Sequence, residues 1–156
     1  MITTATQADG SQIHTINAGI SIFSAEEVQC VDELFDEYLA EGADQSGYYF
    51  LVDKVEQQVL GYTCYGPRAL TNRTYDLYWI AVDAQTHSHG VGRGLLAATE
   101  EAIRLLSGRL LVVETSGLPE YVPTRAFYLA TGYTLEATLK DFYAEGDDLV
   151  IFTKHL

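Results

Sequence analysis

The sequence is poor in cysteine and in basic residues, and both scarcities restrict what the protein can be. Only Cys30 and Cys64 occur among 156 residues. Two cysteines are too few for a disulfide framework, so we expect a reducing cytoplasm. Nine lysines and arginines stand against 22 acidic residues, for a net charge of −13. This balance argues against a nucleic-acid partner, which requires a basic face. It either serves solubility or attracts cationic substrates.

Long apolar runs are also missing. No segment reaches the roughly 18 consecutive apolar residues of a membrane span, and the N-terminus lacks the basic start and apolar run of a signal peptide. The chain is nevertheless 47% hydrophobic, which is enough for one sizeable core. Its length predicts a single domain over residues 1–156, with no membrane partner.

The hydrophobic periodicity predicts alternating helices and strands. The clearest helix starts at Ser24, which forms a capping box with Glu27, and stops at Gly42. Further helices are predicted over about 92–107 and 123–131, and strands over 48–54, 57–66, 75–82, 109–115, 133–143 and 148–156, with a short strand around 12–16. The run 109–115 is continuously apolar, as in a strand buried on both faces. The order predicts an α/β fold with a mixed central sheet of six to seven strands and about four helices.

The stretch "HSHGVGRGLL", residues 87–96, places glycines directly before a helical pattern. The first N–H groups of a helix lack intrahelical acceptors, and the helix dipole adds partial positive charge there. Glycine permits close approach of an anion because it has no Cβ. The stretch therefore fits a phosphate site, with a glycine-rich turn that holds no ligand as the alternative.

Other readings of this loop fit less well. A dinucleotide fingerprint needs a glycine where Leu95 stands, and a P-loop needs a lysine that is absent. His87 and His89 have no Cys, Asp or Glu close by at ligand spacing, so no metal site is predicted.

Two motifs together resemble the GNAT superfamily of N-acetyltransferases. The segment "WIAVDAQTHSHGVGRGLL" is similar to that family's acetyl-CoA-binding segment, in which a strand and loop lead into Gln/Arg-x-x-Gly-x-Gly/Ala and a helix. Here Gly90 and Gly92 are the two glycines, and His87 stands where Gln or Arg is usual. Some 30 residues downstream, "TRAFYLATGY" is similar to the family's A-x-x-F-Y-x-x-x-G-F region.

The resemblance implies a binding site for acetyl-CoA as co-substrate. Backbone N–H groups between His89 and Gly94 would bind the diphosphate, and the strand backbone from Ile80 to Val82 would bind the pantetheine arm and supply an oxyanion donor. The implied cofactor-binding residues are Ile80, Ala81, Val82, His87, His89, Gly90, Val91, Gly92, Arg93 and Gly94.

The resemblance also implies catalytic residues. Tyr128 matches the family's general-acid tyrosine, and a phenol with a pKa near ~10 can protonate a leaving thiolate. The general base is open between Glu114, at the end of a buried strand, and Asp76, at the start of the strand that carries Val82. Each acid could instead be a solvated or hydrogen-bonded strand-end residue. We favour Glu114, because sites in α/β folds cluster at the carboxyl ends of strands.

The predicted function is acetyl transfer from acetyl-CoA to an amine, either a small cationic amine or an amino-acid-like one. Two alternatives stay open: a peptide or protein N-acetyltransferase, and a non-catalytic acyl-CoA-binding module on the same fold. The resemblance also leaves a homodimer open.

Overall fold

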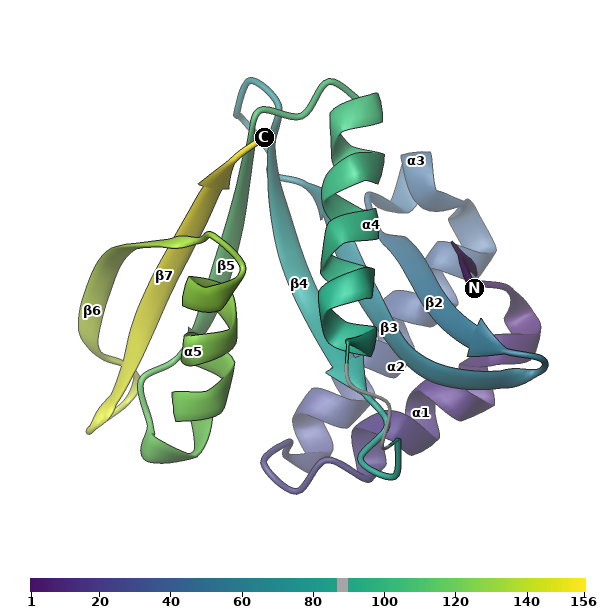
Figure 1. Ribbon diagram of the computed structural model, residues 1–156, viewed down its shortest axis with the longest axis horizontal. Helices are drawn as coiled ribbons and strands as arrows, with labels where there is room; N and C mark the ends of the chain where they lie inside the picture. The colour runs from purple at the N-terminus through teal and green to yellow at the C-terminus, as the bar shows by residue number, and fades with distance from the viewer. Residues whose placement is uncertain (87–89) are drawn as a thin grey trace. The chain divides into compact units, whose positions relative to one another are not determined.

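The computed structural model describes residues 1–86 and 90–156 and has the predicted α/β fold (Figure 1). Seven strands form one mixed sheet in the order β1-β2-β3-β4-β5-β7-β6. The strands are β1 Ile2–Thr4, β2 Tyr49–Val55, β3 Gln58–Pro67, β4 Thr74–Val82, β5 Leu110–Ser116, β6 Thr134–Ala144 and β7 Asp147–His155. The α-helices in the described residues are α1 Gly10–Ala18, α2 Ala25–Glu41, α3 Ala43–Ser46, α4 Val91–Leu105 and α5 Val122–Ala130, and short 3-10 helices span Gln7–Asp9 and Pro119–Tyr121.

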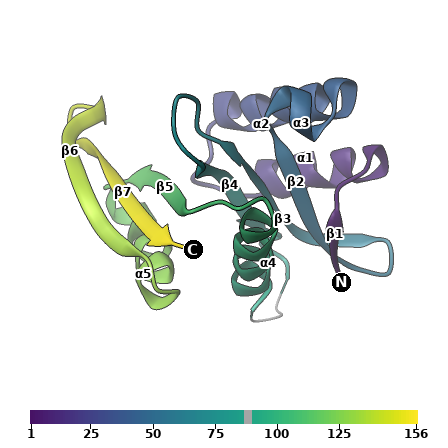
Figure 2. The same ribbon diagram turned by 90° about the horizontal axis from the view of Figure 1, so that it is seen from above.

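The chain forms two compact units, neither of them contiguous in sequence. The first comprises Met1–Gly66 with Tyr78–Ala102, and the second comprises Pro67–Leu77 with Ile103–Leu156. In the first unit β1, β2 and β3 pair antiparallel. Helices α1 and α2 lie on one face of these strands and α4 lies on the opposite face (Figures 1 and 2).

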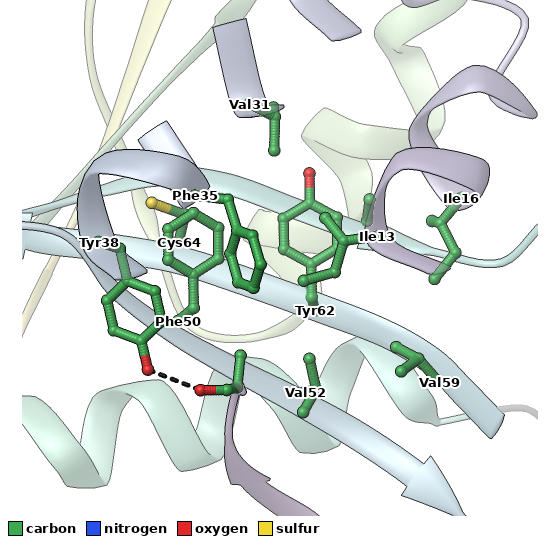
Figure 3. Packing of buried hydrophobic residues seen from close by; sticks show 12 residues of the cluster. Ile13, Ile16, Val31, Phe35, Tyr38, Phe50, Val52, Val59, Tyr62 and Cys64 are labelled. Atoms are coloured by element: carbon green, nitrogen blue, oxygen red, sulfur yellow. Dashed lines mark hydrogen bonds between the residues drawn. The ribbon is translucent and has the colours of Figure 1, made fainter. Parts of the chain in front are cut away.

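The core of the first unit lies between the α1–α2 layer and the sheet (Figure 3). Its aromatic centre is Phe50, whose ring lies 5.0 Å from that of Phe35 and 5.2 Å from that of Tyr38. The Tyr38 hydroxyl donates to the backbone oxygen of Ala5 at 2.7 Å, so this buried phenol is satisfied. Other buried members are Ile13, Ile16, Val31, Val52, Val59, Tyr62 and Cys64.

Helix α2 begins with the predicted capping box. The Ser24 hydroxyl accepts from the Glu27 amide at 3.1 Å, and the Glu27 carboxylate accepts from the Ser24 amide at 2.7 Å. Val31, Phe35 and Tyr38 form the buried stripe at three-four spacing. The three-four spacing also predicts Leu39 on this face, but that side chain is 39% exposed.

Replacing Ser24 with alanine is expected to lower the free energy of unfolding by about 1 kcal/mol, because the Glu27 amide loses its acceptor, the Ser24 hydroxyl. Ser21→Ala is the control, since Ser21 is exposed and makes no hydrogen bond within the described residues. Urea titration of both variants checks this. Equal stability of the two would show that the capping box does not stabilise α2.

The short strand expected around 12–16 is wrong, because this segment lies inside α1. Ile13 and Ile16 are buried at 1% and 4% exposure, whereas His14 and Thr15 between them are exposed. A spacing of three places both isoleucines on one side of a helix. The strand of this region is instead β1, which pairs with β2 through Ile2–Asp53, Thr3–Val52 and Thr4–Leu51.

In the second unit, the first half of β4 pairs parallel with β5, from Thr74–Leu110 to Leu77–Val113. On its other side β5 pairs antiparallel with β7, which in turn pairs with β6. Helix α5 covers one face of β5 and β7 (Figures 1 and 2). The prediction that β5 is buried on both faces is wrong. Leu111 and Val113 on one face are buried. On the other face Leu110 and Val112 are half-buried and Glu114 is exposed. The alternation follows because α5 lies on one face only.

Candidate functional site

The N-terminus of α4 has the features of an anion site. Gly90 precedes the helix with a φ of +105°, and a Cβ built there would have nothing within 4 Å. The Gly94 amide donates to the Gly90 carbonyl at 2.8 Å, which closes the first turn. The amides of Val91 and Gly92 belong to the first turn of a 15-residue helix, where the helix itself offers no acceptor, and they lie with Arg93 at its positive end. The Gly94 amide is therefore not available as a diphosphate donor, because it is already hydrogen bonded to the Gly90 carbonyl.

Gly61 of β3 lets the start of α4 pack directly on the sheet. A Cβ at this position would lie 2.7 Å from the Ala81 carbonyl oxygen, 3.0 Å from Leu95 Cδ1 and 3.2 Å from Val91 Cγ1. One turn further along α4, the buried hydroxyls of Thr63 and Thr99 are hydrogen bonded at 2.9 Å. Only glycine allows this approach, so Gly61 fixes where the first turn of α4 lies on β3 and β4.

The second half of β4 continues beyond its ladder with β5. The last pair of that ladder is Leu77–Val113, and β4 extends to Val82. On its other side β4 is the neighbour of β3, and the Asp83 amide donates to the Leu60 carbonyl at 2.9 Å. Ile80, Ala81 and Val82 thus lie past the end of the β4–β5 ladder. A strand in this state can accept an extended ligand as an added strand.

The two candidate bases, Asp76 and Glu114, meet through Arg68. The Arg68 Nε donates to both Asp76 carboxylate oxygens at 2.9 Å, and Nη2 donates to Asp76 Oδ1 at 2.7 Å and to Glu114 Oε1 at 3.0 Å. Asp76 is buried, whereas the side chains of Arg68 and Glu114 are 44% and 39% exposed. The hydrogen bonds to Asp76 and Glu114 raise the pKa of the Arg68 guanidinium, so this group is permanently charged.

This arrangement separates the two acids chemically. Both oxygens of Asp76 accept from Arg68, so Asp76 has little capacity left for a substrate proton. Glu114 uses only Oε1, and its Oε2 has no hydrogen-bond partner among the described residues. Of the two candidates, Glu114 is therefore the acid with an available oxygen.

Tyr128 is enclosed by aromatic rings on α5 and its neighbours. Its ring lies 5.6 Å from the rings of Tyr133 and Phe152, and the residue is only 3% exposed. Burial raises the pKa of the phenol above its ordinary value, because a phenolate would lose its hydration. Within the described part of the chain, the hydroxyl has no hydrogen-bond partner. A protonated donor without a structural partner fits a general acid.

The expected site residues therefore fall into two groups. Asp76, Glu114 and Tyr128 belong to the second unit, whereas Ile80–Val82 and the start of α4 belong to the first. Val91 is buried, Gly92 is half-buried and Arg93 is exposed. His87 and His89 lie outside the described residues.

One residue in each unit was not expected from the sequence, Gly61 in the first and Arg68 in the second. An isolated glycine within a strand pattern signals a close backbone approach, so Gly61 could have been found. Arg68 stands in the loop after β3, at a sequence separation of 46 from Glu114, and no local pattern reports that pairing.

Residues 1–86 and 90–156 contain no group of three or more His, Cys, Asp or Glu side chains placed to hold a metal ion. In the same residues, no helix combines the length and apolar character required to cross a membrane.

Comparisons with known proteins agree on one family. A model of the acetyltransferase (GNAT) family matches residues 17–133. A crystal structure from Desulfovibrio desulfuricans, described as an acetyltransferase of the GNAT family, is 40% identical with a TM-score of 0.95, and the match covers 99% of this chain and 98% of that one. No protein of curated function matches the sequence.

Two more distant structures share the fold. A ribosomal-protein-alanine N-acetyltransferase from Brucella melitensis has a TM-score of 0.77 at 23% identity, covering 100% of this chain and 99% of that one. An aminoglycoside 6'-N-acetyltransferase complexed with coenzyme A has a TM-score of 0.78 at 11% identity, covering 99% and 96%.

Proposed function

The chain belongs to the GNAT family of acetyltransferases, and from this premise we propose that it transfers an acetyl group from acetyl-CoA directly to an amine. The observation that carries the proposal is the start of α4, where the positive end of a 15-residue helix follows a glycine with open space around its Cβ position. A diphosphate needs such a combination of donors, positive potential and space.

The proposed acetyl-CoA site uses backbone groups for most of its contacts. The amides of Val91, Gly92 and Arg93 bind the diphosphate, and the Arg93 side chain adds positive charge. The edge of β4 from Ile80 to Val82 binds the pantetheine arm, because a strand offers donors and acceptors at regular spacing. An amide near Val82 stabilises the oxyanion, and one such donor is worth roughly 3 kcal/mol. His87 and His89 remain proposed ligands of the diphosphate.

The proposed reaction divides two proton transfers between two residues. The amine nitrogen attacks the thioester carbonyl, so a carbon–nitrogen bond forms and the carbon–sulfur bond breaks. An alkyl amine with a pKa near ~10.4 arrives mostly charged at neutral pH, so the nitrogen must lose two protons, one before the attack and one after it. Glu114 takes the first proton, which makes the amine nucleophilic, and later releases it to water. Tyr128 gives its proton to the leaving sulfur, and its phenolate is reprotonated by the second proton of the nitrogen. Asp76, held by Arg68, orients this arrangement rather than acting as the base.

The proposed acceptor is a small amine that is cationic or amino-acid-like. The net charge of −13 supports a cation, because an acidic protein raises the local concentration of positively charged ligands. The distant structures with the same fold include acetyltransferases named for a ribosomal protein and for aminoglycosides. An N-terminal amine or lysine of a protein therefore stays the second candidate.

A thiol-release assay with acetyl-CoA tests the proposal against a panel of alkyl amines, amino acids, polyamines, aminoglycosides and peptides. Turnover with small amines supports it, and turnover with peptides alone supports the protein-directed alternative. Coenzyme A binding without turnover of any amine would indicate a non-catalytic module. Absence of both binding and turnover would contradict the proposal.

Glu114→Gln is expected to lower kcat at pH 7 by at least about 100-fold, because the base is lost. The deficit should shrink as the pH approaches the amine's pKa near ~10.4, where the acceptor loses its proton without help. Glu120→Gln, which removes an exposed acid of the same unit, is the control and should match the wild-type protein. A deficit that is constant across pH would remove Glu114 from the role of base.

A further inference from the structure

Arg68 joins two carboxylates of different environments with one guanidinium. Asp76 has a side chain only 11% exposed, on β4, whereas Glu114, on β5, is 39% exposed. Asp76 is opposite Val112 in the parallel ladder, and Glu114 follows Val112 by two residues. Side chains alternate along a strand, so Asp76 and Glu114 lie on the same face of the sheet.

The Arg68 backbone is fixed at both of its polar groups. Its amide donates to the Thr74 carbonyl at 2.8 Å, and its carbonyl accepts from the Thr71 hydroxyl at 2.7 Å. The base of the side chain therefore cannot drift with the loop, and the planar fork of the guanidinium fixes the angle between its donors. Arg68 thus holds both carboxylates by hydrogen bonds from a backbone position that is itself fixed.

Together, Arg68, Asp76 and Glu114 have a defined net charge and a defined number of hydrogen-bond acceptors still available. One guanidinium and two carboxylates carry a net charge of one negative unit. Asp76 is engaged at both oxygens and Glu114 at Oε1, which leaves Glu114 Oε2 as the acceptor without a partner among the described residues. This single negative charge and the Glu114 Oε2 acceptor are complementary to one ammonium group.

We propose that Arg68 is a positioning residue that presents Glu114 Oε2 to the ammonium of the acceptor and selects amines without a carboxylate beside the amine. The selection follows from charge: such a carboxylate would approach Glu114 and Asp76, whose two negative charges are only half balanced by the one guanidinium of Arg68. This inference rests on the proposed amine acetyltransferase activity and narrows its acceptor class.

The test compares n-propylamine with 2-aminobutyric acid, which differs by a carboxylate on the amine-bearing carbon, in the wild-type protein and in Arg68→Gln and Arg68→Lys. The wild-type protein should show at least a 10-fold higher kcat/KM for n-propylamine. In Arg68→Gln, kcat should fall 10- to 100-fold because Glu114 loses its orientation. The KM for n-propylamine should stay equal or fall, because the site gains a second negative charge.

Arg68→Lys restores the charge without the fork, so it should recover part of kcat. Arg73→Gln is the matched control, because it removes a positive charge from the same loop and Arg73 has no carboxylate partner among the described residues. Coenzyme A affinity and melting temperature, measured for every variant, separate loss of folding from loss of positioning.

Several outcomes overturn the inference about Arg68. These are an unchanged kcat in Arg68→Gln, a parallel rise of KM with a fall of kcat as expected for general damage, and equal or better use of 2-aminobutyric acid by the wild-type protein. If the wild-type protein acetylates no amine in the panel, the proposed function fails first, and the inference fails with it. If the wild-type protein acetylates amines and Arg68→Gln has the same kcat, the inference about Arg68 is overturned and the proposed function is not.

Discussion

Replacing Tyr128 with phenylalanine is expected to lower kcat for acetyl transfer by about 100- to 1000-fold while leaving the affinity for coenzyme A within twofold. The loss is of the size that general acid catalysis contributes. The fold should not suffer, because the Tyr128 hydroxyl has no hydrogen-bond partner among the described residues. Removing a hydroxyl without a partner costs no hydrogen bond, so the free energy of unfolding should stay equal or rise.

Steady-state kinetics, coenzyme A calorimetry and urea titration measure the three quantities on the same variant. Tyr133→Phe is the matched control, since Tyr133 is also 3% exposed and lies against the Tyr128 ring. Wild-type turnover in Tyr128→Phe would exclude Tyr128 as the acid. A large drop in stability would show instead that the phenol is part of the core.

Replacing Gly90 with alanine is expected to weaken coenzyme A binding at least 10-fold, or about 1.4 kcal/mol. The new Cβ would enter the open space that the diphosphate is proposed to occupy. The backbone would also resist a φ of +105°, which side chains other than glycine's rarely adopt. The amides that follow would then be displaced.

Gly146→Ala provides a close control for this effect. Gly146 lies between β6 and β7 with a φ of +84°, and a Cβ there also meets nothing within 4 Å. Both variants should lose similar stability from backbone strain, but only Gly90→Ala should lose coenzyme A affinity in a calorimetric titration. Equal affinities would exclude the start of α4 as the diphosphate site.

Local sequence signals predicted most of the elements because their causes are local. The capping box of Ser24 and Glu27 and the three-four stripe of α2 are properties of neighbouring residues. The hairpin of β2 and β3 follows from two runs separated by a short turn. The segment 12–16 was misread because it is short and contains only Ile13 and Ile16 as clear apolar markers, and two residues do not fix a period.

Features that depend on distant partners were not predictable in this way. The exposure of Glu114 and the half-burial of Val112 depend on α5 covering one face of β5, which the apolar run 109–115 does not report. The hydrogen bonds of Arg68 to Asp76 and Glu114 depend on contact between a loop and two strands. Tyr128 and the cofactor-binding residues were predicted from the family's motifs, and Glu114 and Asp76 from their places in strands. Neither signal names the partners that hold these side chains.

The division into two units also could not be read from the sequence. Both β4 and α4 contribute residues to each unit, so the division follows contacts and not chain order. The prediction of a single domain over residues 1–156 stays a prediction.

The most direct measurement of the central claim is an amide-resolved NMR titration of the protein with coenzyme A. We expect the backbone amides of Val91, Gly92 and Arg93 to show the largest, saturable chemical-shift changes, accompanied by those of Ile80 to Val82. Binding that leaves these amides unperturbed, or no binding at millimolar coenzyme A, would contradict it.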